Sequence, residues 1–446
     1  MDKHDSQHLL EQPASDAPTH VLIIGYVWPE PRSSAASGHV MQLIQCFLEQ
    51  GWQITFASPA TEGEHKADLA ELGIHEVSIE LNNSSFDVFI SELQPDIVLF
   101  DQFMIEEQFG WRVEKHCPNA LRILETSDLQ SLRHARHQQL KDHLSTSSQP
   151  DDLEGFFEKS ARTIYSAMAT GDLSKREVAA LYRSDLSLMT SDVEMQLLTR
   201  EFRLPEAILH WCPLMISSIP ATARPFNERA HFLSIGNFRH APNWDAVLWM
   251  KNAIWPLIRQ QLPKAQLHIY GSYTPPKATA LHNAAQGFHV MNWAEDALQV
   301  MSEARICLAP LRFGAGVKGK IVDAMLCGTP TVTTPIGAEA MSGDLPWPGS
   351  IANSAERIAA EAVRLYQDEE RWHEAQSAGW ALLEARYRHN EHCASLIARI
   401  EHLRQNLHAH RAANFTGAML RHHHHKSTQY MAQWIEAKNR NPASSL

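Results

Sequence analysis

Short apolar runs alternate with longer stretches of mixed polarity from residue 20 to about residue 334. In the first half these runs are HVLIIG at 20–25, QITFA at 53–57, DIVLF at 96–100, LRILE at 121–125 and LSLMT at 186–190. Each run has the length of a strand and lacks the alternation of a half-exposed strand. Buried strands separated by helical stretches predict a parallel sheet that is covered by helices on both faces.

The stretches between these apolar runs have sequence patterns that are typical of helices. After Gly38, apolar residues fall on one helix face at Val40, Leu43, Ile44, Phe47 and Leu48. We therefore expect a helix that begins after Gly38. Two S-x-x-E sequences, from Ser174 to Glu177 and from Ser191 to Glu194, are typical of the capping box at a helix N-terminus.

The same alternation begins again in the second half of the chain. Its apolar runs are HFLSIG at 231–236, QLHIYG at 266–271, FHVM at 288–291, RICLAP at 305–310 and PTVTT at 330–334. Between the two halves, PLMISSIPATARP at 213–225 has the composition of a linker. Beyond about residue 355 the pattern is helical throughout. The sequence thus predicts two successive α/β domains and a helical C-terminal extension.

These patterns set the expected boundaries. We expect a disordered leader over 1–18, a first α/β domain over 19–212, a linker over 213–229 and a second α/β domain over 230–375. Helices over 376–412 should pack back on the first domain, with Trp380, Leu383 and Tyr387 on their apolar face. The polar, His-rich tail over 413–446 has little apolar surface to bury.

Composition narrows the class of protein. The 446 residues include 39 Lys and Arg against 51 Asp and Glu, a net charge of −12, and 44% are hydrophobic. These values exclude a disordered chain, and the acidic balance argues against a nucleic-acid-binding protein. No apolar stretch has the length of a membrane span, and the N-terminus has no signal-peptide core. We expect a cytoplasmic protein with at most peripheral membrane contact.

The six cysteines show no metal-site or disulfide pattern, and most lie in apolar runs. The sequence therefore predicts buried, reduced thiols and no metal. The RHHHHK stretch at 421–426 lacks acidic or cysteine partners. A weak metal site and a solvated helical tail both fit this stretch, and we favour the tail.

The segment from Pro310 to Thr334, PLRFGAGVKGKIVDAMLCGTPTVTT, carries the strongest chemical signal. A strand ends at Pro310, and a loop with Gly314, Gly316, Lys318 and Lys320 enters a helix. Glycines let backbone N–H groups approach a ligand, and a helix N-terminus favours anions. The loop suits a diphosphate, and the alternative is a flexible surface loop with solvated lysines.

One helical turn further on, Asp323 can face the same crevice and accept two ribose hydroxyls. Nucleotide motifs of other kinds are missing. The loop does not match the P-loop pattern, because Ile321 follows Lys320, and Gly25 does not begin a G-x-G-x-x-G sequence.

Several stretches in this order resemble a glycosyltransferase of the GT-B fold, most similar to the large retaining family 4 (group 1). They are SIGNFRHAPNWDAVLWMKNAIWPLIRQQLPKAQLHIYGS at 234–272, APLRFGAGVKGKIVDAMLCGTPTVTTPIGAE at 309–339 and EVAALYRSDLSLMTSDVEMQLL at 177–198. The resemblance covers about residues 20 to 390. It implies two Rossmann-like domains that face each other across a cleft, with the nucleotide-sugar donor on the second domain and the acceptor on the first.

The resemblance also assigns residues to the donor. It places Gly314, Gly316, Lys318 and Lys320 in the donor-diphosphate loop, and Asp323 where the family holds the ribose with the second glutamate of its E-x7-E motif. It places Gly236 and Arg239 in the first loop of the second domain, near the phosphates. The first glutamate of the motif has no match, because the FGAGVKGK loop is two residues longer than usual. The catalytic carboxylate is therefore unplaced.

In the first domain, the family often has a His-Asp pair after the strand at 121–125. Here that position holds Ser127 and Asp128. We assign Asp128 and Lys320 as candidate catalytic residues, with helix capping as the alternative for Asp128. Further candidates for the acceptor side of the cleft are Arg133 and Arg136, which share a helix face, Asp101 at a strand end, and Gly38, whose alternative role is a tight turn.

The resemblance implies transfer of a sugar from a UDP-type or GDP-type nucleotide sugar to a hydroxyl of a glycan, glycolipid or other acceptor, with retention. Lys318, Lys320, Arg239 and the helix N-terminus can stabilise the departing phosphates without a metal or further cofactor. Bacterial surface polysaccharide or glycoconjugate synthesis is the expected role, at the inner face of the membrane or in the cytoplasm. A non-catalytic nucleotide-sugar-binding protein and a nucleotide-sugar 2-epimerase remain the alternatives.

Overall fold

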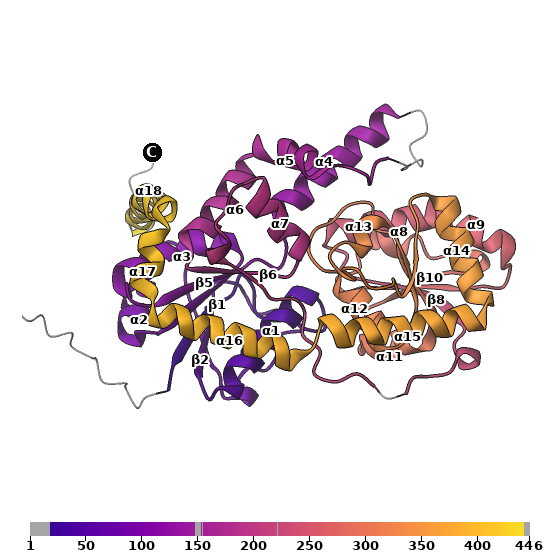
Figure 1. Cartoon of the computed structure of the whole chain (residues 1–446), viewed down its shortest axis with the longest axis horizontal. Coiled ribbons are helices and arrows are strands. Elements are labelled where there is room, and N and C mark those ends of the chain that lie inside the picture. The colour runs from indigo at the N-terminus through magenta and orange to yellow at the C-terminus, as the bar shows by residue number, and fades with distance from the viewer. Residues whose placement is uncertain (1–17, 148–152, 154, 221, 441–446) are drawn as a thin grey trace, which may run out of the picture.

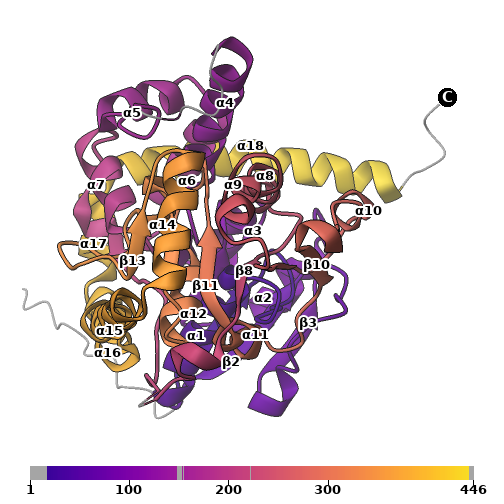
Figure 2. The same cartoon turned by 90° about the vertical axis from the view of Figure 1, so that its right-hand side faces the viewer.

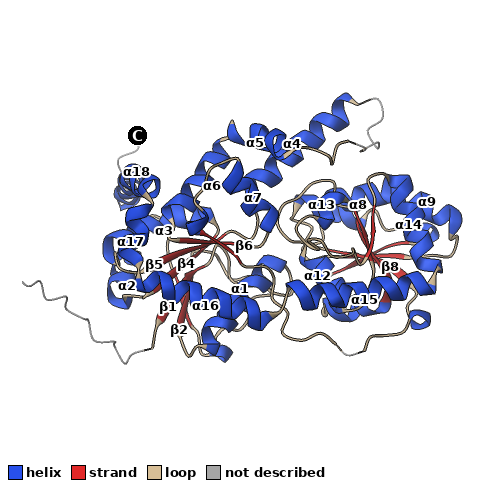
Figure 3. Cartoon of the chain, viewed as in Figure 1, coloured by secondary structure: helices blue, strands red, loops and turns tan. Residues whose placement is uncertain are grey.

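Two α/β domains lie side by side in the computed structural model, which describes residues 18–147, 153, 155–220 and 222–440 (Figure 1). The expected disordered leader over 1–18 lies almost wholly outside the described residues. Figure 3 shows a separate sheet in each domain, with helices on both faces of each. The predicted fold class, two Rossmann-like domains with a helical C-terminal region, is confirmed.

The first domain has a seven-stranded parallel sheet with the strand order β3-β2-β1-β4-β5-β6-β7. The strands are β1 (His20–Ile24), β2 (Gln53–Ser58), β3 (His75–Ser78), β4 (Ile97–Asp101), β5 (Leu121–Glu125), β6 (Leu186–Met189) and β7 (Leu209–Trp211). The helices are α1 (Ala35–Glu49), α2 (Ser85–Leu93), α3 (Phe103–His116), α4 (Gln130–Thr146), α5 (Ala161–Ala169), α6 (Asp172–Arg183) and α7 (Asp192–Arg200). All five predicted strands are present, and the additional β3 and β7 are short strands at the two edges.

The second domain repeats the topology with six parallel strands in the order β10-β9-β8-β11-β12-β13. They are β8 (His231–Ile235), β9 (Leu267–Tyr270), β10 (Phe288–Asn292), β11 (Ala304–Ala309), β12 (Thr331–Thr333) and β13 (Gly349–Ile351). The helices are α8 (Ala241–Trp249), α9 (Trp255–Gln261), α10 (Pro276–Thr279), α11 (Ala297–Glu303), α12 (Gly319–Leu326), α13 (Pro335–Ala338) and α14 (Ala355–Gln367). In both sheets the strand order reverses beside the first strand, which is where open α/β sheets bind ligands.

The C-terminal helices connect the domains. α15 (Glu369–Arg386) runs along the second domain and α16 (His389–Gln405) along the first (Figure 1). Leu383 and Tyr387 are buried against α12 of the second domain, with Trp380 packed at the edge of the same cluster. The return to the first domain is therefore made by α16, whose Cys393 and Leu396 join the hydrophobic core around β1.

Within the C-terminal tail, a long helix packs on the first domain. After α17 (Leu407–Ala413), the helix α18 (Phe415–Arg440) contacts α3 and α6 of the first domain, and Figure 2 shows it lengthwise. Ala432 and Arg421 are buried, and the Arg421 guanidinium donates to the carbonyl of Arg183. The tail is therefore packed on the first domain through small and long polar side chains, whereas its large apolar side chains are exposed.

An arm made by α4 and α5 reaches from the first domain onto the second (Figure 1). Leu140 and Phe156 of this arm pack in the hydrophobic core of the second domain, and the His137 ring stacks on Phe313 with the centroids 4.2 Å apart. Phe313 belongs to the glycine- and lysine-rich loop. The first domain therefore helps to hold that loop in place.

Candidate functional site

The loop that follows β11 meets the first domain across the interdomain cleft. Gly316 has a positive φ of 63°, and a Cβ built there would lie 2.8 Å from the Cβ of Asp128. A Cβ on Gly319 would lie 2.4 Å from that of Ala35, at the start of α1. A side chain at either glycine would therefore collide with the first domain, so the glycines allow the loop to reach it.

Lys318 and Lys320 flank the N-terminus of α12. Lys318 is buried, and its Nζ donates to the carbonyl of Gly316 at 2.5 Å. The aliphatic part of Lys318 lies beside Gly314, 3.7 Å from where a Cβ would be. Burial lowers the pKa of Lys318. The structure thus brings Gly314, Gly316 and Lys318 together, as predicted for one loop.

Lys320 points toward Gly236, the residue after β8. Its Nζ donates to Oδ1 of Asn243 at 2.7 Å and lies 2.7 Å from where a Gly236 Cβ would be. Burial lowers the pKa of Lys320 to about 8. A partly buried ammonium group with one amide partner retains donors for an anion. Asn243, which the sequence analysis did not single out, belongs to this group through the N-terminal part of α8.

Asp323 lies one turn into α12 and is partly buried. Burial raises the pKa of its carboxyl to about 7. Among the described residues, no side chain or backbone group donates a hydrogen bond to it. A carboxylate with unused acceptors near a phosphate loop has the chemistry needed to bind ribose hydroxyls.

Asp323→Asn should stabilise the free protein at high pH. A carboxyl whose folded pKa is raised contributes stability below its unfolded pKa, near 3.9, and that stability is lost as the pH rises through about 7. We expect equal stability of the two proteins near pH 4 and an advantage of about 1–3 kcal/mol for Asp323→Asn at pH 8. Urea unfolding at both pH values measures this, and an advantage that does not change with pH would contradict it.

The Arg239 guanidinium contacts an aromatic ring of the second domain. Its guanidinium stacks over the Tyr273 ring at 3.6 Å, and the Tyr273 hydroxyl donates to Glu30 of the first domain at 2.8 Å. Among the described residues, the Arg239 guanidinium makes no hydrogen bond or ion pair with the loop from Gly314 to Lys320. Its place beside the phosphates stays a prediction.

Asp128 and Arg133 form an ion pair on the first-domain side of the cleft. The alternative role of Asp128 as a helix cap is wrong. Leu129 occupies the N-cap position of α4, and the amides of Gln130 and Ser131 donate to the carboxylate of Glu177 at 2.8 and 3.0 Å. Glu177 thus caps α4 from within α6, which begins at Asp172, so the predicted capping box at Ser174 is also wrong.

Arg136 connects the domains. Its guanidinium donates to both carboxylate oxygens of Glu339, at 2.7 and 2.6 Å, and to the carbonyl of Gly314 at 2.9 Å. Burial alone would raise the pKa of Glu339, but Arg136 holds it below its ordinary value. Arg136 therefore fixes the position of the loop from the first domain.

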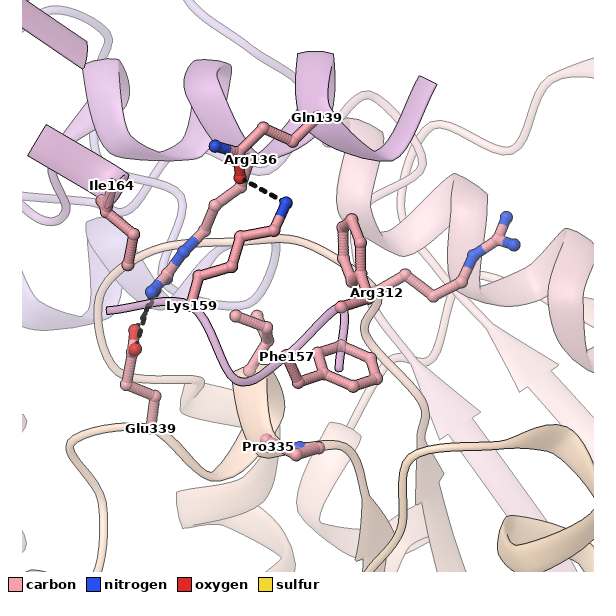
Figure 4. Close-up of a pocket in the computed structure, with 10 residues that line it drawn as sticks. Arg136, Gln139, Phe157, Lys159, Ile164, Arg312, Pro335 and Glu339 are labelled. Atoms are coloured by element: carbon pink, nitrogen blue, oxygen red, sulfur yellow. Dashed lines mark hydrogen bonds and ion pairs between the residues drawn. The ribbon is translucent and has the colours of Figure 1, made fainter. Parts of the chain in front are cut away.

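A small hollow, open to solvent, adjoins this contact. Figure 4 shows Arg136 of the first domain directed at Glu339 of the second, whereas Lys159 points toward Gln139. The Lys159 ammonium donates to Oε1 of Gln139 at 3.0 Å. The hollow thus lies between the arm and the second domain, next to the loop.

Glu194 is a further carboxylate at the loop. Ser191 caps α7 through the amide of Glu194, as predicted, but the Glu194 side chain accepts hydrogen bonds from the amides of Leu129 and Gly316. Burial, followed by the charge of Asp128, raises the pKa of Glu194 to about 7. In this structure the Gly316 amide is therefore directed at Glu194. The sequence motif predicted only the helix cap and gave no sign that Glu194 binds the loop of the second domain.

Asp101 ends β4 and is buried near two other ionisable side chains. Its Oδ2 accepts from the amide of Tyr26 at 3.3 Å, and burial together with the charge of Glu125 raises its pKa to about 7. The Glu125 carboxylate accepts from the amide of Ser127 and lies 3.2 Å from Nδ1 of His39. Asp101 thus belongs to a buried cluster beneath the Ser127–Asp128 turn.

Gly38 lies within α1, which begins at Ala35 with Ser34 as its N-cap. The prediction that the helix starts after Gly38 is therefore wrong, and the tight-turn alternative is wrong as well. A Cβ at Gly38 would meet nothing within 4 Å. The first turn of α1 thus has open space at this position.

Comparisons with known proteins agree with this architecture. Residues 229–368 match the family model described as "Glycosyl transferases group 1". This part of the chain is thus similar to a glycosyltransferase group 1 domain, and the two facing domains have the GT-B fold that the resemblance implied. No curated protein matches the chain by sequence.

Solved structures of similar fold cover most of the chain. Sucrose-phosphate synthase from Thermosynechococcus elongatus is 14% identical, with a TM-score of 0.61 over 86% of this chain and 99% of its own. Anabaena HepE in complex with UDP and glucose is 10% identical, with a TM-score of 0.61 over 86% and 100%. WaaG, a glycosyltransferase involved in lipopolysaccharide biosynthesis, is 12% identical, with a TM-score of 0.53 over 80% and 94%. At these identities the likeness concerns the fold.

Proposed function

We propose that the protein is a retaining glycosyltransferase of the family 4 type, which transfers a sugar from a nucleotide-diphosphate sugar to an acceptor hydroxyl. The observation that carries this proposal is the convergence of Lys318, Lys320 and Gly236 at the N-terminus of α12, opposite Asp128 across the cleft. Buried cations at a helix N-terminus stabilise a leaving diphosphate as negative charge develops on it. The group 1 domain match supports the same activity.

The donor is proposed to be a UDP-sugar ahead of a GDP-sugar, because HepE was solved with UDP and with UDP-glucose. Asp323 would hold the ribose, and the two lysines would hold the phosphates without a metal or further cofactor. The acceptor is proposed to be a glycan, a glycolipid or another hydroxyl compound of bacterial surface polysaccharide synthesis, with no nucleic acid involved. It would enter beside Asp128 and the open first turn of α1 at Gly38.

A thermal-shift screen of nucleotide sugars tests donor binding, because a ligand of the native state raises Tm. Nucleotide release is then measured with and without hydroxyl acceptors, in the presence of a chelator. We expect release that requires an acceptor and a product with the anomeric configuration of the donor. Release without an acceptor would favour the 2-epimerase or hydrolysis, and binding without turnover would favour a nucleotide-sugar-binding protein.

Contact with the cytoplasmic face of a membrane is proposed to occur through α18. None of the helices within the described ranges is long and apolar enough to cross a bilayer. The exposed face of α18 nevertheless carries large apolar side chains, at Phe415, Met419, Tyr430, Met431 and Trp434. Exposed aromatic side chains beside lysines are typical of helices that lie in a membrane interface.

Replacing Tyr430 and Trp434 together by alanine should weaken binding to anionic phospholipid vesicles about tenfold, because both rings are more than half exposed. Co-sedimentation with phosphatidylglycerol-containing vesicles measures this. Leu298→Ala, an exposed apolar residue of the second domain, is the matched control. Equal binding by the double variant and the control would contradict membrane contact through α18.

A further inference from the structure

Four side chains with metal-binding atoms converge where α16 returns to the first domain, away from the cleft. Sγ of Cys46, a ring nitrogen of His389 and Sγ of Cys393 all lie within 4.8 Å of one another. The carboxylate of Glu49 is 3.0 Å from Nε2 of His389 and 3.8 Å from Sγ of Cys393. Among the described residues, Cys46, His389 and Cys393 form the one group of three such ligands.

Helix spacing explains why these four side chains meet. Cys46 and Glu49 are three residues apart on α1, and His389 and Cys393 are four residues apart on α16. Residues at these spacings project from the same helix face. Because α1 and α16 pack against each other, each helix presents two ligand atoms to the other. A sequence search for CxxC pairs misses such a group, since its halves lie at least 340 residues apart.

Burial distinguishes this group from an incidental surface cluster. Cys46 is fully buried, and Cys393 and His389 are 5% and 4% exposed. The Cys46 thiol also lies 3.7 Å from Sδ of Met215, and both cysteines belong to the hydrophobic core around β1. Glu49 is the one ligand in contact with water, with a side chain 40% exposed. The packing around the sulfur atoms therefore limits their movement.

We propose that Cys46, His389 and Cys393 bind a zinc ion, with Glu49 as the fourth ligand. Two thiolates, one imidazole and one carboxylate form a tetrahedral set that zinc accepts. Zinc–ligand bonds of about 2.0–2.3 Å place the ligand atoms about 3.3–3.8 Å apart, so small shifts bring Cys46, His389 and Cys393, now within 4.8 Å of one another, to this spacing. Binding breaks the two S–H bonds, forms two Zn–S bonds and releases two protons to solvent.

The site is structural and separate from the proposed sugar transfer. Cys46 lies eleven residues beyond Ala35, so about 16 Å along α1 separates it from the contact with Gly319. Four protein ligands leave no open position for a substrate. The ion would instead fasten α16, and with it the crossing C-terminal segment, to the first domain. The expectation of no metal would then be wrong for this helix pair.

Cobalt substitution of the reduced full-length protein tests the proposal. Co²⁺ should give near-ultraviolet thiolate-to-metal absorption with one equivalent bound per chain, and Zn²⁺ should displace it. Cys46→Ser and Cys393→Ser should each lose most of this absorption, and His389→Gln should weaken Co²⁺ binding at least tenfold. Cys117→Ser and His423→Gln, which change a buried thiol elsewhere and an exposed tail histidine, should leave it unchanged.

Absence of the thiolate band in the reduced wild-type protein would overturn the proposal, whether or not the variants fold. A Cys46–Cys393 disulfide in protein purified without reductant and resistant to added Zn²⁺ would overturn it as well. Metal analysis after dialysis distinguishes zinc bound at this site from zinc bound by the RHHHHK stretch. Zinc that remains in Cys46→Ser but is lost when those histidines are replaced would show tail binding and also overturn the proposal.

Discussion

Replacing Lys320 by alanine should weaken binding of a nucleoside diphosphate by about 1.5–3 kcal/mol, the range for a hydrogen bond to a charged group. The Lys320 ammonium is held at the end of β8 by Asn243, and Gly236 leaves space in front of it. Because its pKa is about 8, the group is mostly charged at pH 7. Isothermal titration calorimetry with UDP and with GDP at pH 7 measures the loss.

Two further variants make this result specific. Lys264→Ala removes an exposed lysine of the same domain and should leave the affinity unchanged. Lys318→Ala should weaken binding as well, though less, because the Lys318 ammonium already donates to the carbonyl of Gly316. If neither Lys318→Ala nor Lys320→Ala changes the affinity, the loop does not bind the diphosphate.

The main strands were predictable because a buried strand is a mainly apolar run in the sequence. HVLII at 20–24 and RICLA at 305–309 are short, mainly apolar runs, and both belong to central strands. The edge strand β3, with the sequence HEVS, has no such run, because its side chains are partly exposed to water. The packing of α18 was also missed, because buried Arg421 and Ala432 do not form an apolar pattern.

The candidate site was predictable only where one segment forms it. Gly314, Gly316, Lys318 and Lys320 follow one another in the sequence, so their proximity needed no knowledge of the fold. Glu194 meets Gly316 across 122 residues, and Arg136 meets Glu339 across 203. Such pairs depend on how the two domains face each other. For the same reason local spacing suggested a cap for Asp128, whereas the fold supplies Glu177 from another helix.

Asp128→Asn should lower kcat on the order of 10²-fold or more while Tm changes little. Asp128 lies against Gly316 of the loop, and its carboxylate is paired with Arg133. Asparagine retains the size of the side chain and removes its charge. Since a displacement of about 1 Å at a reacting centre costs about 10²-fold in rate, loss of a charged positioning group should appear in kcat. The measurement uses the donor and acceptor found by the nucleotide-sugar screen, both at saturation.

Comparison with Arg133→Gln decides whether Asp128 acts directly on the substrates. If Asp128 only positions Arg133, the two single variants and the double variant should lose the same activity, since they remove one unit. If Asp128 also contacts sugar or acceptor, Asp128→Asn should be the slower enzyme. Asp142→Asn, which changes an exposed carboxylate on the helix that carries Arg133, should keep full activity. Full activity of Asp128→Asn would instead direct attention to Asp101, whose carboxyl lies beneath the same turn with a pKa raised to about 7 by burial and by Glu125.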